Sequence, residues 1–158
     1  MTVLGADELN TDPLLLFNQW FAEAQKSEIN DPDAIALASV DADGMPSVRM
    51  VLLKEILPEG FVFYTNYTSR KSGELMATGK AAFVIHWKSL RRQIRVTGSV
   101  VQVPDAQSDA YYQTRSRGSR IGAWASQQSK PLQNRGELAA AVRKIEGTYP
   151  DEVPRPTH

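Results

Sequence analysis

Cationic and hydroxyl side chains gather at three places in this sequence, and the first suggests anion binding. Ser69-Arg70-Lys71 lies at the expected start of a helix, where free backbone N–H groups, a hydroxyl and two cations would suit a phosphate. An ordinary capped helix with a solvated basic first turn explains the same residues. Cations at a helix start oppose the helix dipole, however, so they need another reason. This favours the phosphate interpretation.

The second place is the segment Arg49–Lys54, which reads Arg-Met-Val-Leu-Leu-Lys. Its alternation predicts a strand with an apolar body in the core and a cation at each end. Taken alone, a half-exposed strand with solvated ends explains it better. The third place holds Tyr111, Arg115 and Ser119, spaced four apart. A helical start and its extension would put all three on one side, where they could hold a second phosphate.

Composition excludes several other kinds of chemistry. The 158 residues contain no cysteine, so disulfides, thiolate metal sites and cysteine nucleophiles are ruled out. There are two histidines; His86 lies in an expected strand and should be packed or hydrogen-bonded rather than catalytic, and His158 ends the sequence. Eighteen basic and eighteen acidic residues balance, which disfavours binding of nucleic acid through the basic run Arg91, Arg92 and Arg95. Phosphate-loop, dinucleotide and nucleophile-elbow motifs are missing from the sequence.

The sequence shows neither a secretory signal nor an apolar run of membrane-spanning length. A soluble, cytoplasmic protein is therefore expected. Residues 1–10 are small and polar and should form a flexible N-terminus, followed by one domain over residues 11–158.

The elements expected to position these side chains are mostly strands. Thr11-Asp12-Pro13 signals a helix start, and Leu14, Phe17, Phe21 and Ala24 then share a helical face. Apolar runs and turn signals predict strands at residues 34–40, 46–56, 61–65, 81–87 and 93–103. Further helices are expected from residues 68, 104 and 134, with a short turn at 121–125. The fold class predicted is mainly β: a small antiparallel β-barrel with peripheral helices.

Taken together, the motifs resemble the pyridoxine (pyridoxamine) 5′-phosphate oxidase family. The motifs follow the family order over roughly residues 12–156: Asp12-Pro13-Leu14, Arg49–Lys54, Phe63–Asn66, Ser69–Lys71, Trp87, Arg92–Gly98, Arg115, Ser119–Ala125 and Ser126–Ser129. So many spaced motifs are very unlikely to match by chance.

The resemblance implies an FMN-binding split barrel that works as a homodimer, with FMN at the subunit interface and some contacts from the partner. It also implies that Arg49 and Lys71 reach toward the FMN phosphate. The FMN contacts it implies are Arg49, Met50, Val51, Leu52, Leu53, Lys54, Tyr64, Thr65, Ser69, Arg70, Lys71, Gln93, Gln128 and Ser129. The substrate phosphate would be held by Lys54, Tyr111, Arg115 and Ser119.

The family reaction converts pyridoxine or pyridoxamine 5′-phosphate to pyridoxal 5′-phosphate, with dioxygen as acceptor and hydrogen peroxide as product. The flavin carries this chemistry, so no catalytic side chain is expected. The family continues past the region of Val153-Pro154-Arg155-Pro156 with a further segment that closes the substrate site, whereas this sequence ends at His158. We therefore expect a truncated or shortened relative without the last strands. The alternative function is a non-catalytic FMN- or pyridoxal-phosphate-binding protein of the same fold.

Overall fold

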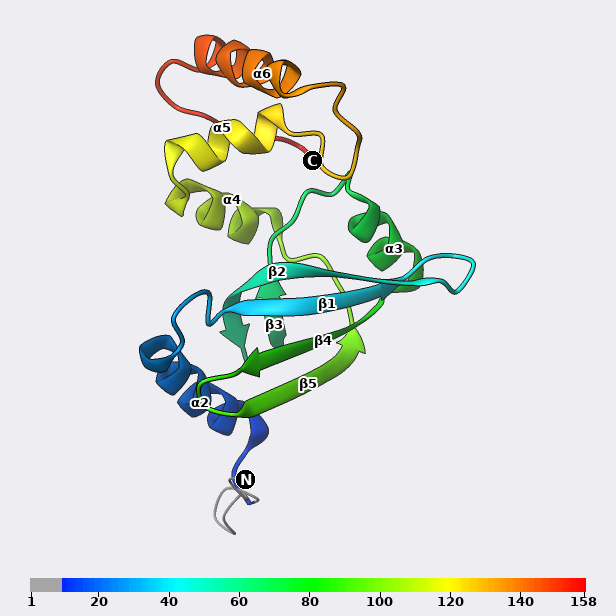
Figure 1. Ribbon diagram of the computed structural model, residues 1–158, viewed down its shortest axis with the longest axis vertical. Helices are drawn as coiled ribbons and strands as arrows, with labels where there is room; N and C mark the ends of the chain where they lie inside the picture. Colours follow the sequence, from blue (N-terminus) through cyan, green and yellow to red (C-terminus); the bar gives the residue numbers. More distant parts are fainter. Residues whose placement is uncertain (1–9) are drawn as a thin grey trace. The chain divides into compact units, whose positions relative to one another are not determined.

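The computed structural model describes residues 10–158, which form two compact units (Figure 1). The first unit contains the chain up to Tyr64 together with Lys80–Ser99, and the second contains Thr65–Gly79 and Val100–His158. Residues 1–9, which make up nearly all of the expected flexible N-terminus, lie outside the described residues. In the described part, no helix has the length and apolar character needed to cross a membrane.

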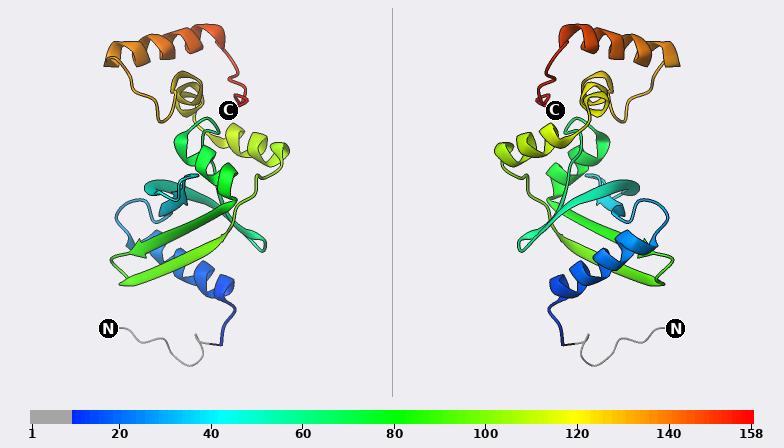
Figure 2. Two further views of the ribbon diagram at one scale, coloured as in Figure 1. Left: turned by 90° about the vertical axis from the view of Figure 1, so that its right-hand side faces the viewer. Right: turned by 90° about the vertical axis from the view of Figure 1, so that its left-hand side faces the viewer.

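A five-stranded antiparallel sheet forms most of the first unit. Its strands are β1 (Ala34–Val40), β2 (Pro46–Leu57), β3 (Gly60–Phe63), β4 (Lys80–Trp87) and β5 (Arg92–Ser99). They are arranged in the order β3-β2-β1-β4-β5, and every neighbouring pair is antiparallel. The sheet is curled into half of a barrel (Figure 2). The predicted antiparallel split-barrel class is confirmed.

Two of the strands predicted from the sequence extend further than the strands in the structure. β5 ends at Ser99 rather than at residue 103, because its last partner is Lys80, and Gly79 before it has a left-handed φ of 62° that ends the pairing. β3 ends at Phe63 instead of residue 65. Residues 64–68 are therefore a loop and turn rather than the continuation of a strand.

The two faces of β2 differ from the prediction. Leu53 is buried, but Val48, Met50 and Leu52 are 67%, 62% and 40% exposed, so only part of the apolar body lies in the core. The strand β1 places alanines opposite these three residues, at Ala38, Ala36 and Ala34. The part of this outer face that β1 and β2 form is therefore apolar and exposed.

The helix α2 (Pro13–Ser27) packs on the inner face of the same sheet. It begins as predicted, with the Asp12 carboxylate accepting from the Leu14 N–H at 2.7 Å. The predicted apolar face is also confirmed. Phe17 and Ala24 join the buried core, whose other members are Ile35, Leu53, Ile85 and Trp87.

The second unit consists of the helices α3 (Arg70–Thr78), α4 (Asp105–Thr114), α5 (Arg117–Ala125) and α6 (Arg135–Thr148). α5 is longer than the short turn expected from the sequence, and it packs against α6 (Figure 2). The predicted apolar face of α6 is confirmed as its half-buried side, formed by Leu138, Ala141, Val142 and Ile145.

The irregular segment after α6 is firmly attached to the second unit. Val153 is fully buried, and the Trp124 indole N–H donates to the Pro154 carbonyl at 2.7 Å. Arg155 donates to the carboxylates of Asp105 and Asp109, at 2.8 and 2.5 Å, and its hydrogen bond to Asp109 is the main cause that raises the pKa of this guanidinium. These contacts tie the segment to α4 and α5.

Candidate functional site

Lys71 is the centre of a polar cluster in the second unit. Its side chain is buried, with the residue 8% exposed. Its ammonium donates to Gln128 Oε1 at 2.6 Å, to Thr65 Oγ1 at 2.8 Å and to Ser69 Oγ at 3.2 Å. A buried ammonium requires such hydrogen bonds, because its desolvation is costly. We call Thr65, Ser69, Lys71 and Gln128 the lysine cluster; its ammonium, hydroxyl and amide groups suit a phosphate.

The loop before α3 shapes this cluster. The Asn66 side chain accepts from the Thr68 N–H and hydroxyl, both at 2.7 Å, which is a local turn that Asn favours. The Asn66 carbonyl accepts from the hydroxyls of Ser69 and Ser72, both at 2.7 Å. Ser69 thus occupies the N-cap position, but no described side chain caps α3. Of the two cap residues predicted, Thr68 and Ser69, the cap is Ser69, but its hydroxyl bonds the loop and makes no capping hydrogen bond.

Arg70 has a structural partner on its own helix. Its Nε lies 2.7 Å from Glu74 Oε1, and the Glu74 side chain is only 4% exposed. A buried carboxylate needs a compensating charge, so this pair accounts for a cation in the first turn without a ligand. A cation at the start of a helix opposes the helix dipole and needs another reason to be there. For Arg70 that reason is Glu74, so the argument for a phosphate applies better to Lys71.

Gln128 and Ser129 follow α5 in a turn. Ser129 has a φ of 67°, which is uncommon for a residue other than glycine. Gln128 contacts the lysine cluster of its own chain, although it lies 57 positions after Lys71 in the sequence.

In the first unit, Arg49 is fixed between β1 and β2. Its guanidinium donates to Ser39 Oγ at 2.6 Å and to the Leu37 carbonyl at 3.1 Å, and it also bonds the Ser47 hydroxyl. Arg49 is opposite Leu37 in the strand register, and Ser39 is 1% exposed. Arg49 is therefore held on the inner face of the sheet rather than at a solvated strand end.

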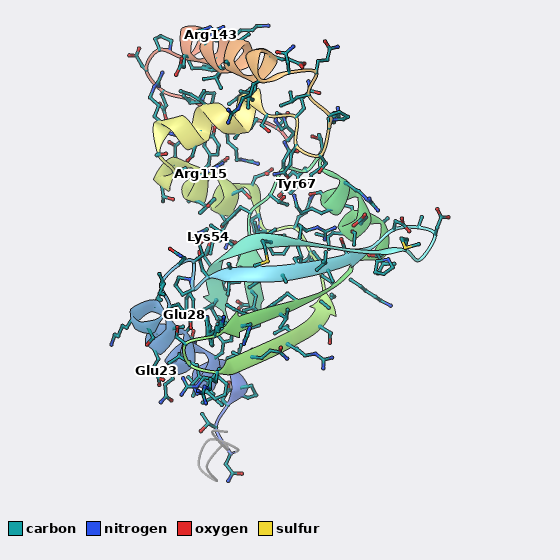
Figure 3. All side chains as sticks on the ribbon, viewed as in Figure 1. Glu23, Glu28, Lys54, Tyr67, Arg115 and Arg143 are labelled. Atoms are coloured by element: carbon teal, nitrogen blue, oxygen red, sulfur yellow. The ribbon has the colours of Figure 1, made fainter. Side chains whose placement is uncertain are left out.

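Lys54 occupies a β-bulge. Leu53 pairs with Phe63 whereas Glu55 pairs with Val62, so Lys54 is an extra residue on β2. Bulges often lie beside functional sites because they redirect a side chain. The Lys54 ammonium bonds Asp33 Oδ2 at 2.8 Å (Lys54 is labelled in Figure 3).

An open hollow of about 360 Å³ lies beside this ion pair, entirely within the first unit. Its lining includes Phe21, Pro32, Asp33, Leu53, Lys54 and Ile56. It combines an apolar wall from α2 and β2 with one cation and one anion at its surface.

The bulge also brings Glu55 to Tyr64. The Tyr64 hydroxyl donates to the Glu55 carboxylate, so Glu55 orients a residue expected to contact FMN. On β5, Gln93 is exposed and pairs in register with His86. His86 is exposed as well, so of the two alternatives expected for it, packed or hydrogen-bonded, the packed one was wrong.

The three residues expected to share a helix side are separated by a break. α4 ends at Thr114, and Arg115, which is labelled in Figure 3, has an extended backbone with ψ of 146°. Ser116 then caps a new helix, accepting from the Ser119 N–H. The helix expected to carry both Tyr111 and Arg115 therefore ends one residue before Arg115, and Ser119 lies on a separate helix, so the three residues do not share one helical side.

Tyr112 links the two helices on either side of this break. It is 4% exposed, and its hydroxyl donates to the Arg120 carbonyl at 3.0 Å. Burial raises the pKa of the Tyr112 phenol. Arg115 lies beside its ring, with 5.9 Å between the guanidinium carbon and the ring centroid. Tyr112 thus helps to fix the backbone on which Arg115 is carried.

Known proteins are similar to this chain over most of its length. Residues 21–149 match the family described as pyridoxamine 5′-phosphate oxidase. The chain belongs to this family. Pyridoxine/pyridoxamine 5′-phosphate oxidases of Brucella canis and Brucella suis are 56% identical to it over 150 residues, which cover 94% of the chain and 74% of each relative. The family predicted from the sequence motifs is thus confirmed.

Solved structures agree on the fold. PhzG from Burkholderia lata, in complex with tetrahydrophenazine-1-carboxylic acid, superimposes with a TM-score of 0.89 at 31% identity and covers 98% of the chain and 77% of its own. A pyridoxamine 5′-phosphate oxidase-related, FMN binding protein from Nostoc punctiforme gives 0.66 at 18% identity, covering 82% and 72%, which supports the fold alone. The family match and the named relatives support an oxidoreductase.

Proposed function

We propose that this protein is an FMN-dependent oxidase that converts pyridoxine or pyridoxamine 5′-phosphate to pyridoxal 5′-phosphate, with dioxygen as acceptor and hydrogen peroxide as product. The relatives at 56% identity carry the name of this activity. The structural observation that carries the proposal is the lysine cluster, which offers a buried ammonium, two hydroxyls and an amide to a phosphate. Both the cofactor and the substrates of this reaction are phosphorylated.

The donor groups present fit FMN. Lys71, Thr65, Ser69 and Gln128 would bind its phosphate, and Arg49 would add a second cation. The other residues proposed to contact FMN are Met50, Val51, Leu52, Leu53, Lys54, Tyr64, Arg70, Gln93 and Ser129. When bound, FMN would supply the two-electron redox chemistry. The protein would contribute binding, orientation of the rings and neutralisation of the phosphates.

We also propose a homodimer with FMN at its interface. The uncovered face of β2, with exposed Val48, Met50 and Leu52 beside the alanines of β1, supports this. Contiguous apolar surface on a soluble protein commonly marks an interaction site.

The proposed activity can be tested directly. The purified protein should show the visible spectrum of bound flavin and the mass of a dimer, and it should form pyridoxal 5′-phosphate and peroxide from pyridoxine 5′-phosphate in air. Bound flavin without product would instead support a non-catalytic FMN-binding protein. No flavin after reconstitution would contradict both functions.

For the substrate phosphate we propose Lys54, Tyr111, Arg115 and Ser119. Arg115→Ala should raise the KM for pyridoxine 5′-phosphate about tenfold or more, because a hydrogen bond to a charged group contributes about 1.5–3 kcal/mol. Steady-state kinetics and the flavin content of the same samples would measure this.

Arg143→Ala is the matched control, since Arg143 is an exposed arginine of α6 (Figure 3). It should leave the KM unchanged. Loss of flavin in the Arg115→Ala protein would show that the two phosphates had been assigned to the wrong residues.

A further inference from the structure

We propose that Asp33 is an internal counter-ion of Lys54, which the substrate phosphate must displace, so that Asp33 sets the affinity for phosphorylated ligands. The observation behind this is the 2.8 Å ion pair between the Lys54 ammonium and Asp33 Oδ2. The inference rests on the proposed function, in which Lys54 binds the substrate phosphate.

Asp33 is presented by a fixed stretch of backbone. Its carbonyl accepts from the Leu53 N–H at 2.8 Å, and the preceding carbonyl, that of Pro32, accepts from the Trp87 indole N–H at 2.8 Å. These two bonds attach the segment before β1 to the sheet without using the Asp33 carboxylate. The carboxylate is therefore not needed to hold the segment in place, and its interaction with Lys54 requires another reason.

Lys54 is the mobile member of the pair. Its ammonium ends a flexible four-carbon stem, and the bulge directs this stem away from the buried position of Leu53. The side chains of Lys54 and Asp33 are 28% and 23% exposed, and the open hollow of about 360 Å³ gives a ligand access to both. Ion pairs that reach solvent contribute little to stability, so a phosphate can take the ammonium from the carboxylate.

The ion pair between Asp33 and Lys54 should lower, and not raise, the affinity for a phosphorylated ligand. A phosphate that binds the Lys54 ammonium must first break the ion pair with Asp33, and this cost lowers the affinity for a phosphorylated ligand. The cost does not apply to a ligand that has the same ring but no phosphate.

The test compares two probes that carry no reactive 4′ group, 4′-deoxypyridoxine 5′-phosphate and 4′-deoxypyridoxine, by calorimetric titration of the FMN-loaded protein. Asp33→Asn keeps the size of the side chain and removes its charge. It should raise the affinity for the phosphorylated probe about 1.5- to 5-fold, the range expected for a solvent-exposed ion pair. The affinity for the unphosphorylated probe should not change. An unchanged or lowered affinity for the phosphorylated probe would overturn the inference.

The same substitution in a Lys54→Gln background shows whether Asp33 acts through Lys54. The two substitutions should be coupled, so that Asp33→Asn no longer raises the affinity there. A gain that persists would mean direct repulsion by Asp33 and would also overturn the inference. If the unmodified protein does not bind the phosphorylated probe, the proposed substrate class fails and the inference with it. Binding without an effect of Asp33→Asn removes the inference alone.

Discussion

Replacing Lys71 by methionine is expected to lower the affinity for FMN about 10- to 100-fold. The buried ammonium makes three hydrogen bonds within the lysine cluster, and a charge-assisted contact to phosphate contributes about 1.5–3 kcal/mol. Methionine retains the apolar stem and removes the charge, so loss of packing is kept small. Fluorescence titration of the apoprotein with FMN measures the dissociation constant.

Two controls make this experiment specific for the phosphate. Arg70→Met changes the neighbouring cation, whose guanidinium bonds Glu74, and should weaken FMN binding less. Riboflavin has the same ring system and no phosphate, so its affinity should be similar in the unmodified and Lys71→Met proteins. An equal loss for riboflavin and FMN would refute the assignment of Lys71 to the phosphate.

Replacing Trp87 by alanine should lower the free energy of unfolding of the first unit by about 3–5 kcal/mol, the usual cost of removing a large aromatic side chain from a core. Trp87 is 1% exposed, and its ring lies 5.7 Å from that of Phe17 and 6.1 Å from that of Phe21. Its indole N–H also bonds the Pro32 carbonyl. Urea unfolding of the apoprotein, followed by circular dichroism, gives the value.

Trp87→Phe separates the two contributions of this residue. It keeps an aromatic ring in the core but leaves the Pro32 carbonyl without its indole partner, so it should cost less than the alanine variant. If Trp87→Ala instead cost under about 1 kcal/mol, Trp87 would not be a core residue in solution. The motif that carried the family resemblance at this position would then need a role at the ligand.

The sequence predicted those parts of the fold whose signals are local. Asp12 and Pro13 start α2 because a cap and a proline act within one helical turn, and the spacing of Phe17 and Ala24 gave its buried face. The sequence also predicted the turn at Asp41. Its carboxylate accepts from two backbone N–H groups of the loop, and Gly44 supplies the positive φ. One local signal was overlooked, the Ser116 cap that starts α5.

For the candidate site, the sequence supplied the residue types and the family resemblance but not the partners. It could not place Gln128 against Lys71, Asp33 against Lys54 or Glu55 against Tyr64, which are 57, 21 and 9 positions apart. Such contacts carry no spacing rule, because they depend on how the backbone is folded between the two residues.

The segment Arg49–Lys54 shows most clearly which features the sequence predicts and which depend on the tertiary structure. Its alternation was sufficient to identify a strand with two cations. Only the pairing with β1 and β3 decided that Arg49 is held on the inner face and that Met50 is exposed. The bulge that redirects Lys54 arises from the register with β3, and a register is a property of two strands together. The sequence of one strand therefore determines that it is a strand, whereas the neighbouring strands determine what each of its side chains can bind.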